Sequence, residues 1–406
     1  MPRYFRAKNI YHQGQFCTEH VLTVDDNGYV IGVLPFRDLS DGAAAVVTDF
    51  GERVIAPGWV DLQLNGCGGG LFNRDLNLIC LEKMLRSSLR HGATSVQPTL
   101  ITCSDEDMLT ALEVMRQAKA LKQSAQKEER QLWQTAMGMH LEGPYISVGR
   151  RGAHPRRLIR PLDDTMLEKL EQAGREGILS YITVGAEAVR AEQVARLAAG
   201  GLTVSLGHSE APIEDSRALL RAGARCFTHL YNGMGGIDSR SPKTLSLALG
   251  DKQAYSGIIA DGHHVAPENI RIAQKLLGER LFLITDATAT ADGGEDTVFF
   301  GEQTCTIQDG TIRNEEGALA GSALTMKRGV EILADLLGWE AALKMASGTP
   351  VQALNPMRRS NRDIGTFAPG SKANFVVFDI QCKKALHDTE QISSLETWVL
   401  GKPWQE

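Results

Sequence analysis

Long apolar runs and closely spaced cysteines are both missing from this 406-residue sequence. No apolar run approaches the roughly 18 residues that a membrane-spanning helix needs. The first residues, MPRYFRAKNIYHQGQ, lack the apolar core and cleavage site of a secretory signal. The seven cysteines are widely scattered and contain no CxxC pair, so neither a zinc knuckle nor a redox motif is indicated. We therefore expect a cytoplasmic protein with reduced thiols and no membrane partner.

An excess of positive charge is also missing. The formal net charge is −6, which argues against binding of nucleic acid or another polyanion through the whole surface. The one local basic patch contains Arg150, Arg151, Arg156, Arg157 and Arg160. We interpret it as a solvated loop, with attraction of an anion as the alternative. An anionic small-molecule substrate would therefore need a local site.

The two ends of the chain have the composition of β-strands. Near the N-terminus, Asp26-Asn27-Gly28 separates two alternating apolar stretches, as in a β-hairpin, and no helix is expected in this part. The tail GTFAPGSKANFVVFD returns to strand composition. Two β-rich ends that flank one central unit most simply pair with each other. We therefore predict a small β-sandwich built from residues 1–54 and 364–406, around a central domain of residues 55–363.

The central part alternates apolar runs that end in Gly, Asn, Asp or His with longer amphipathic stretches. Ser104 opens one of these stretches with an S-x-x-D capping pattern, which indicates a helix. Continuous apolar strands in series with helices predict an α/β fold, a (β/α)8 TIM-type barrel, with a doubly wound sheet as the competing architecture. The eight predicted strands cover residues 54–66, 94–100, 135–143, 179–187, 202–209, 225–232, 255–264 and 281–288.

Polar side chains gather at the ends of these predicted strands, where a TIM barrel places its chemistry. Imidazoles end the fifth, sixth and seventh strands, and carboxylates end the third and the eighth. Such groups, converging at one barrel mouth, match the ligands of a catalytic divalent metal with one position left for water. The residues at the strand ends are Gln63, Asn65, His140, Glu142, His208, His229, Asn232, Asp261, His263, His264 and Asp286.

Asp286 ends an otherwise apolar strand, LITDAT, where an unpaired carboxylate would be costly unless it is functional. A metal lowers the pKa of water, and an adjacent carboxylate can take that proton and deliver it to a leaving amine. The pattern therefore predicts metal-dependent hydrolysis of an amide, with Asp286 as the general base and acid. His140 and Glu142 are two residues apart in the same predicted strand, so their side chains point to the same side. We interpret His140 as a residue that points into the barrel core.

Colinear sequence blocks point to one family. The blocks are PGWVDLQLNGCGG, HLEGPYIS, GAHP, GHSEA, THLYNGM, DGHHV, LITDATA and GSALTM. In this order, between about residue 55 and residue 330, they resemble the N-acetylglucosamine-6-phosphate deacetylases of the amidohydrolase superfamily. The tail GTFAPGSKANFVVFD is similar to the closing sandwich strands of that superfamily.

The resemblance implies removal of acetate from an N-acetylhexosamine 6-phosphate in amino-sugar catabolism. It implies that Glu142, His208 and His229 bind one divalent metal per subunit, with zinc expected, and that Asp286 is the catalytic acid/base. It implies a homodimer with shared active sites, because in the family the neighbouring subunit helps to bind the phosphate. The substrate contacts that it implies are Ala153 and His154 near the acetyl group, and Asn232, Gly233, Arg240, His264, Leu319, Ala320 and Gly321 around the sugar phosphate.

The first barrel strand departs from the superfamily's common His-x-His and reads Gln63-Leu64-Asn65. Two neutral amides cannot replace two imidazoles as ligands of a second metal, so we expect a single-metal site with Gln63 and Asn65 as candidate contacts. The DGHH block and the arginine-rich loop leave open the galactosamine isomer as the preferred substrate. Two more alternatives stay open: another amidohydrolase on the same barrel, and a non-catalytic barrel that binds a sugar phosphate.

Overall fold

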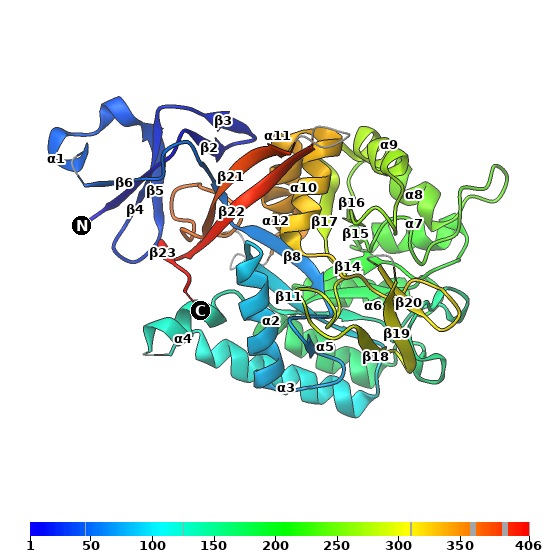
Figure 1. The fold of residues 1–406 in the computed structure, drawn as a ribbon. Coiled ribbons are helices and arrows are strands. Elements are labelled where there is room, and N and C mark those ends of the chain that lie inside the picture. Colours follow the sequence, from blue (N-terminus) through cyan, green and yellow to red (C-terminus); the bar gives the residue numbers. More distant parts are fainter. Residues whose placement is uncertain (45, 125, 309–310, 358–362, 384–388, 406) are drawn as a thin grey trace.

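The computed structural model describes residues 1–44, 46–124, 126–308, 311–357, 363–383 and 389–405. Its centre is a sheet of eight parallel strands in the order β17-β16-β15-β14-β13-β12-β11-β8 (Figure 1). The sheet closes where the Asp286 amide donates to the Gln63 carbonyl at 2.9 Å and Leu64 pairs with Ala287. The predicted (β/α)8 barrel is therefore confirmed. Its strands are β8 (Trp59–Leu64), β11 (Ala93–Ile101), β12 (Met139–Glu142), β13 (Leu179–Val184), β14 (Thr203–Leu206), β15 (Cys226–Phe227), β16 (Tyr255–Ile259) and β17 (Leu281–Ile284).

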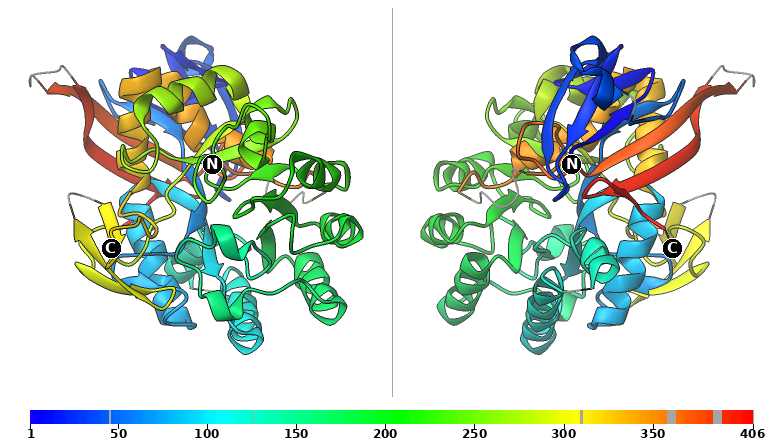
Figure 2. Two further views of the ribbon diagram at one scale, coloured as in Figure 1. Left: turned by 90° about the vertical axis from the view of Figure 1, so that its right-hand side faces the viewer. Right: turned by 90° about the vertical axis from the view of Figure 1, so that its left-hand side faces the viewer.

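Helices surround these strands (Figure 2). Local capping explains where several of them begin: the Ser104 hydroxyl accepts from the Asp107 amide at 3.1 Å, as its capping pattern predicts, and the Asn77 side chain accepts from the Cys80 amide at 2.9 Å. The helices are α2 (Leu78–Arg90), α3 (Asp105–Leu121), α4 (Lys127–Trp133), α5 (Asp164–Glu176), α6 (Ala191–Ala199), α7 (Ile213–Arg221), α8 (Thr244–Gly250), α9 (Pro267–Leu277), α10 (Met326–Leu337), α11 (Trp339–Ala346) and α12 (Gly348–Ala353). None of the described helices is long and apolar enough to cross a membrane.

Strands from both ends of the chain form two further sheets on one side of the barrel (Figure 1). One has the order β5-β4-β1-β6 and the other the order β23-β22-β21-β7-β2-β3. Phe5 and Leu22 from the first sheet share a small core with Ile55 and Phe375 from the second. Their strands are β1 (Arg3–Arg6), β2 (Asn9–His12), β3 (Gln15–Cys17), β4 (His20–Val24), β5 (Val30–Pro35), β6 (Val47–Asp49), β7 (Val54–Pro57), β21 (Phe375–Lys383), β22 (Thr389–Val399) and β23 (Lys402–Pro403).

The terminal segments differ from the expectation in two details. A short 3-10 helix (Phe36–Asp38) and α1 (Asp41–Ala44) connect β5 to β6, so the expectation of no helix in this part was wrong. The strand predicted over 54–66 is two strands, because β7 pairs with β2 and β21 while β8 belongs to the barrel. The domain boundaries at 54/55 and 363/364 stay a prediction. Residues 54–57 form β7, which pairs with strands of the terminal sheet.

A three-stranded antiparallel sheet interrupts the chain between β17 and α10. It consists of β18 (Thr297–Phe300), β19 (Gln303–Gln308) and β20 (Thr311–Asn314). Its buried side chains, such as Phe300, pack against Leu71 of the short ribbon that β9 (Gly66–Cys67) and β10 (Gly70–Leu71) form. The turn at Gly301 lies against the backbone of Ala153. A Cβ at Gly301 would lie 1.7 Å from the Ala153 carbonyl oxygen. The inserted sheet therefore packs on the loop that contains His154.

The passage from the terminal sheet into the barrel depends on Gly58. A Cβ at this position would lie 2.2 Å from Oγ1 and 2.8 Å from Cβ of Thr94, so no rotamer of Thr94 makes room for it. Gly58→Ala should therefore lower the free energy of unfolding by about 1–3 kcal/mol through overpacking. Urea denaturation checks this, with Gly32→Ala as the matched control, because a Cβ at Gly32 would have no atom within 4 Å. Equal stability of the two variants would contradict the expectation.

Candidate active site

Glu142, His208, His229 and Asp286 lie together at the carboxyl ends of β12, β14, β15 and β17. Glu142 is the last residue of its strand, and each of the other three comes two residues after its strand ends. His208, His229 and Asp286 have positive φ angles of 48°, 32° and 51°. Such left-handed backbone is uncommon for residues other than glycine and concentrates at functional sites. Glu142, His208 and His229 are buried at the mouth of the barrel, and Asp286 beside them is half-buried.

The two histidines present the same ring nitrogen to the site. Nδ1 of His208 donates to the Arg150 carbonyl at 2.7 Å, and Nδ1 of His229 donates to the Asn232 carbonyl at 3.1 Å. A carbonyl oxygen only accepts hydrogen bonds, so in the neutral ring each Nδ1 carries the proton and each Nε2 presents a lone pair. Backbone carbonyls that orient the ring in this way are usual behind metal-binding histidines.

These lone pairs converge with a carboxylate oxygen. The two Nε2 atoms lie 3.0 Å apart, and Glu142 Oε1 lies 2.9 Å from Nε2 of His229 and 3.3 Å from Nε2 of His208. Three atoms that only accept hydrogen bonds repel one another unless a cation lies between them. Ligands of a tetrahedral zinc ion, bonded at 2.0–2.1 Å, are separated by about 3.3 Å. The group Glu142, His208 and His229 therefore fits one divalent metal.

The two amides of the first barrel strand connect the carboxylates. Gln63 Nε2 donates to Glu142 Oε1 and to Asp286 Oδ1, both at 3.0 Å, and Asn65 Nδ2 donates to Asp286 Oδ1 at 2.7 Å. Burial, together with the negative charge of Glu142, raises the pKa of Asp286 to about 6. Gln63 and Asn65 thus orient the carboxylates. Within the described residues, Glu142, His208 and His229 are the one cluster with metal-ligand spacing.

His154 and His140 have different environments. His154 is buried beside His208, with ring centroids 4.5 Å apart, and its Nε2 lies 4.0 Å from Glu142 Oε2. Burial lowers the pKa of His154 well below its ordinary value, so the ring is neutral. His140 points into the barrel core, where Nε2 lies 2.8 Å from the Thr183 hydroxyl, and burial lowers its pKa to about 4. His140 is therefore a hydrogen-bonded core residue.

Several of the expected substrate contacts lie next to these residues. Gly233 approaches His208 so closely that a Cβ would lie 2.9 Å from Nδ1, and Asn232 orients His229 through its carbonyl. The segment from Leu319 to Gly321, which includes the buried Ala320, leads directly to Ser322, whose amide donates to the Asp286 carbonyl at 2.8 Å. Ala153 packs against the inserted sheet, and His154 is the next residue.

The two residues expected at the phosphate differ in exposure: the His264 side chain is nearly buried, whereas Arg240 is exposed. His264 is held by Asp261, with Nδ1 2.6 Å from Oδ2. Arg240 lies in an exposed loop between β15 and α8, and in the described part of the chain no hydrogen bond or ion pair joins its guanidinium to the buried cluster. The structure therefore brings Asp286 and His154 together with the cluster of possible metal ligands, which consists of Glu142, His208 and His229. It does not bring Arg240 into contact with this cluster.

The arginine-rich loop has a structural role that its composition did not indicate. Arg150 pairs with Glu210 at 3.4 Å, Arg157 pairs with Glu302, and Arg160 pairs with Asp105. These pairs hold the loop whose Arg150 carbonyl orients His208. Sequence reasoning could not find this contact, because a backbone carbonyl has no signature in the residue type.

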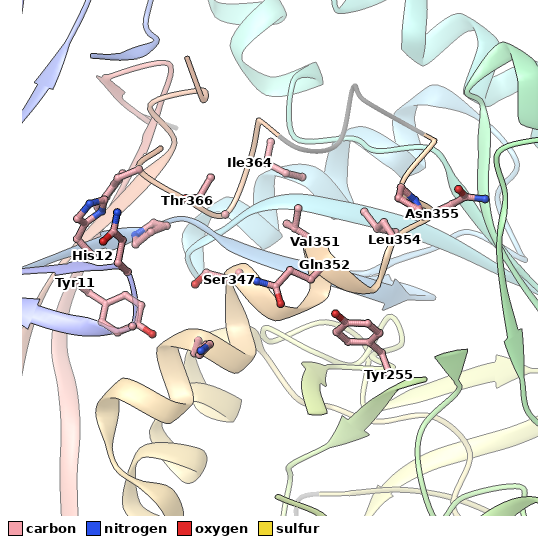
Figure 3. Close-up of a pocket in the computed structure, with 18 residues that line it drawn as sticks. Tyr11, His12, Tyr255, Ser347, Val351, Gln352, Leu354, Asn355, Ile364 and Thr366 are labelled. Atoms are coloured by element: carbon pink, nitrogen blue, oxygen red, sulfur yellow. The ribbon is translucent and has the colours of Figure 1, made fainter. Parts of the chain in front are cut away.

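A cavity of about 640 Å³ lies at the other end of the barrel, away from this cluster (Figure 3). Tyr255 at the start of β16, Ser347 between α11 and α12, and Tyr11 of the terminal sheet line it. Because TIM-barrel chemistry sits at the carboxyl ends of the strands, this cavity is not the candidate active site.

The fold and the cluster at its mouth define a class of protein, the metal-dependent barrel hydrolases that cleave amides. The model of the amidohydrolase family matches residues 54–402. The chain belongs to this family and, within it, to the N-acetylglucosamine-6-phosphate deacetylase family.

Individual relatives agree with this assignment. The chain is 32% identical to the N-acetylglucosamine-6-phosphate deacetylase of Haemophilus influenzae, over 87% of this chain and 89% of that protein. It is 34% identical to an N-acetylgalactosamine-6-phosphate deacetylase of a Shewanella species, over 86% of this chain and 82% of that protein. The crystal structure of the deacetylase from Pasteurella multocida superimposes with a TM-score of 0.87 at 31% identity, over 99% of both chains.

The convergence of the two Nε2 atoms on Glu142 predicts how metal binding responds to mutation. His208→Ala and His229→Ala should each lose the metal, because removal of one of three protein ligands opens the site. Elemental analysis of the purified proteins measures this, with close to one metal per chain expected before mutation. His263→Ala is the matched control, since His263 is an exposed histidine at the same end of the barrel. Full occupancy in both ligand variants, or a reproducible two metals per unmodified chain, would contradict the assignment.

Proposed function

We propose that the protein hydrolyses the acetamide of N-acetyl-D-glucosamine 6-phosphate to D-glucosamine 6-phosphate and acetate, in amino-sugar catabolism. The observation that carries the proposal is the buried convergence of His208, His229 and Glu142 beside Asp286. A variant deacetylase from Mycobacterium smegmatis, solved in complex with N-acetyl-D-glucosamine-6-phosphate, superimposes with a TM-score of 0.84 at 27% identity over 100% of both chains.

One divalent metal, with zinc as the best match to this ligand set, is held by Glu142, His208 and His229. When bound, such a metal polarises the amide carbonyl and makes water a better nucleophile at neutral pH. Asp286 takes a proton from the water that attacks the amide carbon. It then delivers the proton to the amine nitrogen as the C–N bond breaks. Gln63 and Asn65 aim the Asp286 carboxylate through their 3.0 Å and 2.7 Å hydrogen bonds.

The remaining contacts hold the substrate. His154 donates to the acetyl oxygen as negative charge develops on it, with Ala153 beside it. Arg240 and His264 bind the phosphate, because a guanidinium can engage a phosphate with two hydrogen bonds. Asn232, Gly233 and residues 319–321 line the sugar. From the family resemblance, the proposal includes a homodimer in which the neighbouring subunit completes the phosphate site, and sedimentation measurements can test the dimer.

The protein acts in the cytoplasm in this proposal. Six cysteines whose environment the structure describes are free thiols, which fits a reducing compartment. N-acetylgalactosamine 6-phosphate is the second candidate substrate, because a relative at 34% identity is named for it.

The decisive experiment measures acetate release from the 6-phosphates of N-acetylglucosamine and N-acetylgalactosamine, and from both unphosphorylated sugars. We expect the highest kcat/KM for the glucosamine isomer. Arg240→Ala should raise KM for the phosphorylated sugar much more than for the plain sugar. Faster turnover of the galactosamine isomer would select the second candidate, and no acetate from any of the four would refute the proposal.

Asp286→Asn tests the acid/base step. The amide keeps the shape of the side chain but cannot take a proton, so kcat should fall by about 10²–10⁴-fold. Metal content and thermal stability should stay close to those of the unmodified protein. Asp26→Asn, at an exposed turn of the terminal sheet, is the control that should leave turnover unchanged. A near-normal kcat in Asp286→Asn would remove Asp286 from the mechanism.

A further inference from the structure

Thr102 lies directly behind His154, on the side of the ring that faces away from the metal-type cluster. Thr102 is the residue that follows β11. Thr102 and His154 are both buried. The Thr102 hydroxyl lies 2.7 Å from Nδ1 of His154, and the Thr102 backbone amide donates to the same nitrogen at 3.3 Å. A nitrogen that accepts from a backbone amide carries no proton of its own. The Thr102 hydroxyl must therefore also donate to Nδ1.

This arrangement gives His154 the opposite tautomer from His208 and His229. With Nδ1 unprotonated, the single proton of the neutral ring is on Nε2. Nε2 is the atom that faces the cluster, and its 4.0 Å distance from Glu142 Oε2 is too long for a hydrogen bond. No described residue forms a hydrogen bond with this N–H group. It is therefore free to donate to an oxygen of a bound molecule.

The backbone around Gly143 makes room for the contact. A Cβ at Gly143 would lie 2.5 Å from the Thr102 hydroxyl oxygen and 3.4 Å from Nδ1 of His154. Gly143 also has a φ of 75°, which favours glycine. The residue after Glu142 thus leaves open the space through which Thr102 reaches His154. The residue after β11 and the loop after β12 thus meet at this one hydrogen bond.

We propose that Thr102 is a positioning residue, which fixes the tautomer of His154 so that Nε2–H points at the acetyl oxygen of the substrate. The inference rests on the proposed function and deepens it. As the amide carbon becomes tetrahedral, negative charge develops on that oxygen, and a donor held in place stabilises it. Without the hydroxyl, the ring keeps only the longer contact with the Thr102 amide. It can then rotate or move its proton to Nδ1, and the donor is lost.

The kinetic test compares Thr102→Val with Thr102→Ser in the metal-loaded enzyme. Valine keeps the shape but removes the hydroxyl, so kcat should fall about tenfold, with KM and metal content little changed. Serine keeps the hydroxyl and should restore kcat. Thr94→Val is the matched control: Thr94 is a buried threonine of β11, the strand that ends one residue before Thr102, and its hydroxyl has no described partner. An equal loss in Thr94→Val, or no rescue by serine, would overturn the proposal.

A second measurement does not depend on activity. In the metal-loaded enzyme labelled with ¹⁵N-histidine, NMR distinguishes a protonated from an unprotonated ring nitrogen. We expect the proton on Nε2 of His154 and on Nδ1 of His208 and His229, with His154→Gln used to assign the signal. Thr102→Val should weaken or remove the Nε2–H signal of His154.

The two measurements separate the possible failures. A proton on Nδ1 of His154 in the unmodified protein would overturn the proposal, whatever the activity. An unchanged Nε2–H signal in Thr102→Val would do the same. If neither acetylated sugar phosphate is hydrolysed, the proposed function fails, whereas the NMR spectrum still reports whether Thr102 sets the tautomer.

Discussion

Two imidazole nitrogens and one carboxylate oxygen, all of them acceptors, are held about 3 Å apart at the mouth of the barrel. Such a group is unstable without a cation, so the surrounding fold has to hold it in place. The Arg150 and Asn232 carbonyls fix the two rings, and the Gln63 amide fixes the carboxylate. The closure of β17 onto β8 brings Asp286 to the same place. A metal bound to this group would therefore stabilise the folded chain, as in other sites that the unfolded chain cannot form.

Backbone and hydroxyl partners divide the buried histidines by role. A carbonyl behind Nδ1 gives His208 and His229 an outward lone pair, which suits a metal ligand. An amide and a hydroxyl behind Nδ1 give His154 an outward N–H, which suits a hydrogen-bond donor. The three rings lie in contact, with centroids 4.5 Å and 4.7 Å apart in succession. Chemically identical side chains thus present opposite hydrogen-bonding groups, set by the partners on the far side of each ring.

The barrel could be predicted from the sequence, because eight apolar runs ended in polar residues and the carboxyl ends of parallel strands meet. The same reasoning placed Glu142, His208, His229 and Asp286 at one mouth. The break at Gly58 could not be predicted, since it depends on the pairing of β7 with β2 and β21, whereas β8 pairs with β11. The Arg150 carbonyl and Thr102 were also missed. A carbonyl is common to all residues, and a threonine after an apolar strand carries no signal until its neighbours in space are known. The acid/base role of Asp286 was predicted from the residue pattern, whereas the ligand set and the substrate contacts came from the family resemblance.

The pairing of the chain ends has a consequence for synthesis on the ribosome. β7 emerges early, but its partner β21 belongs to the last part of the chain. While the barrel strands are being made, the N-terminal strands have an unpaired edge and lack part of their apolar core, a state that favours association with other chains. The N-terminal sheet is complete only when the C-terminal strands pair with it. Truncated or stalled chains would therefore expose an unpaired sheet edge that favours aggregation. The first strands are thus protected from aggregation only after the last strands have been synthesised.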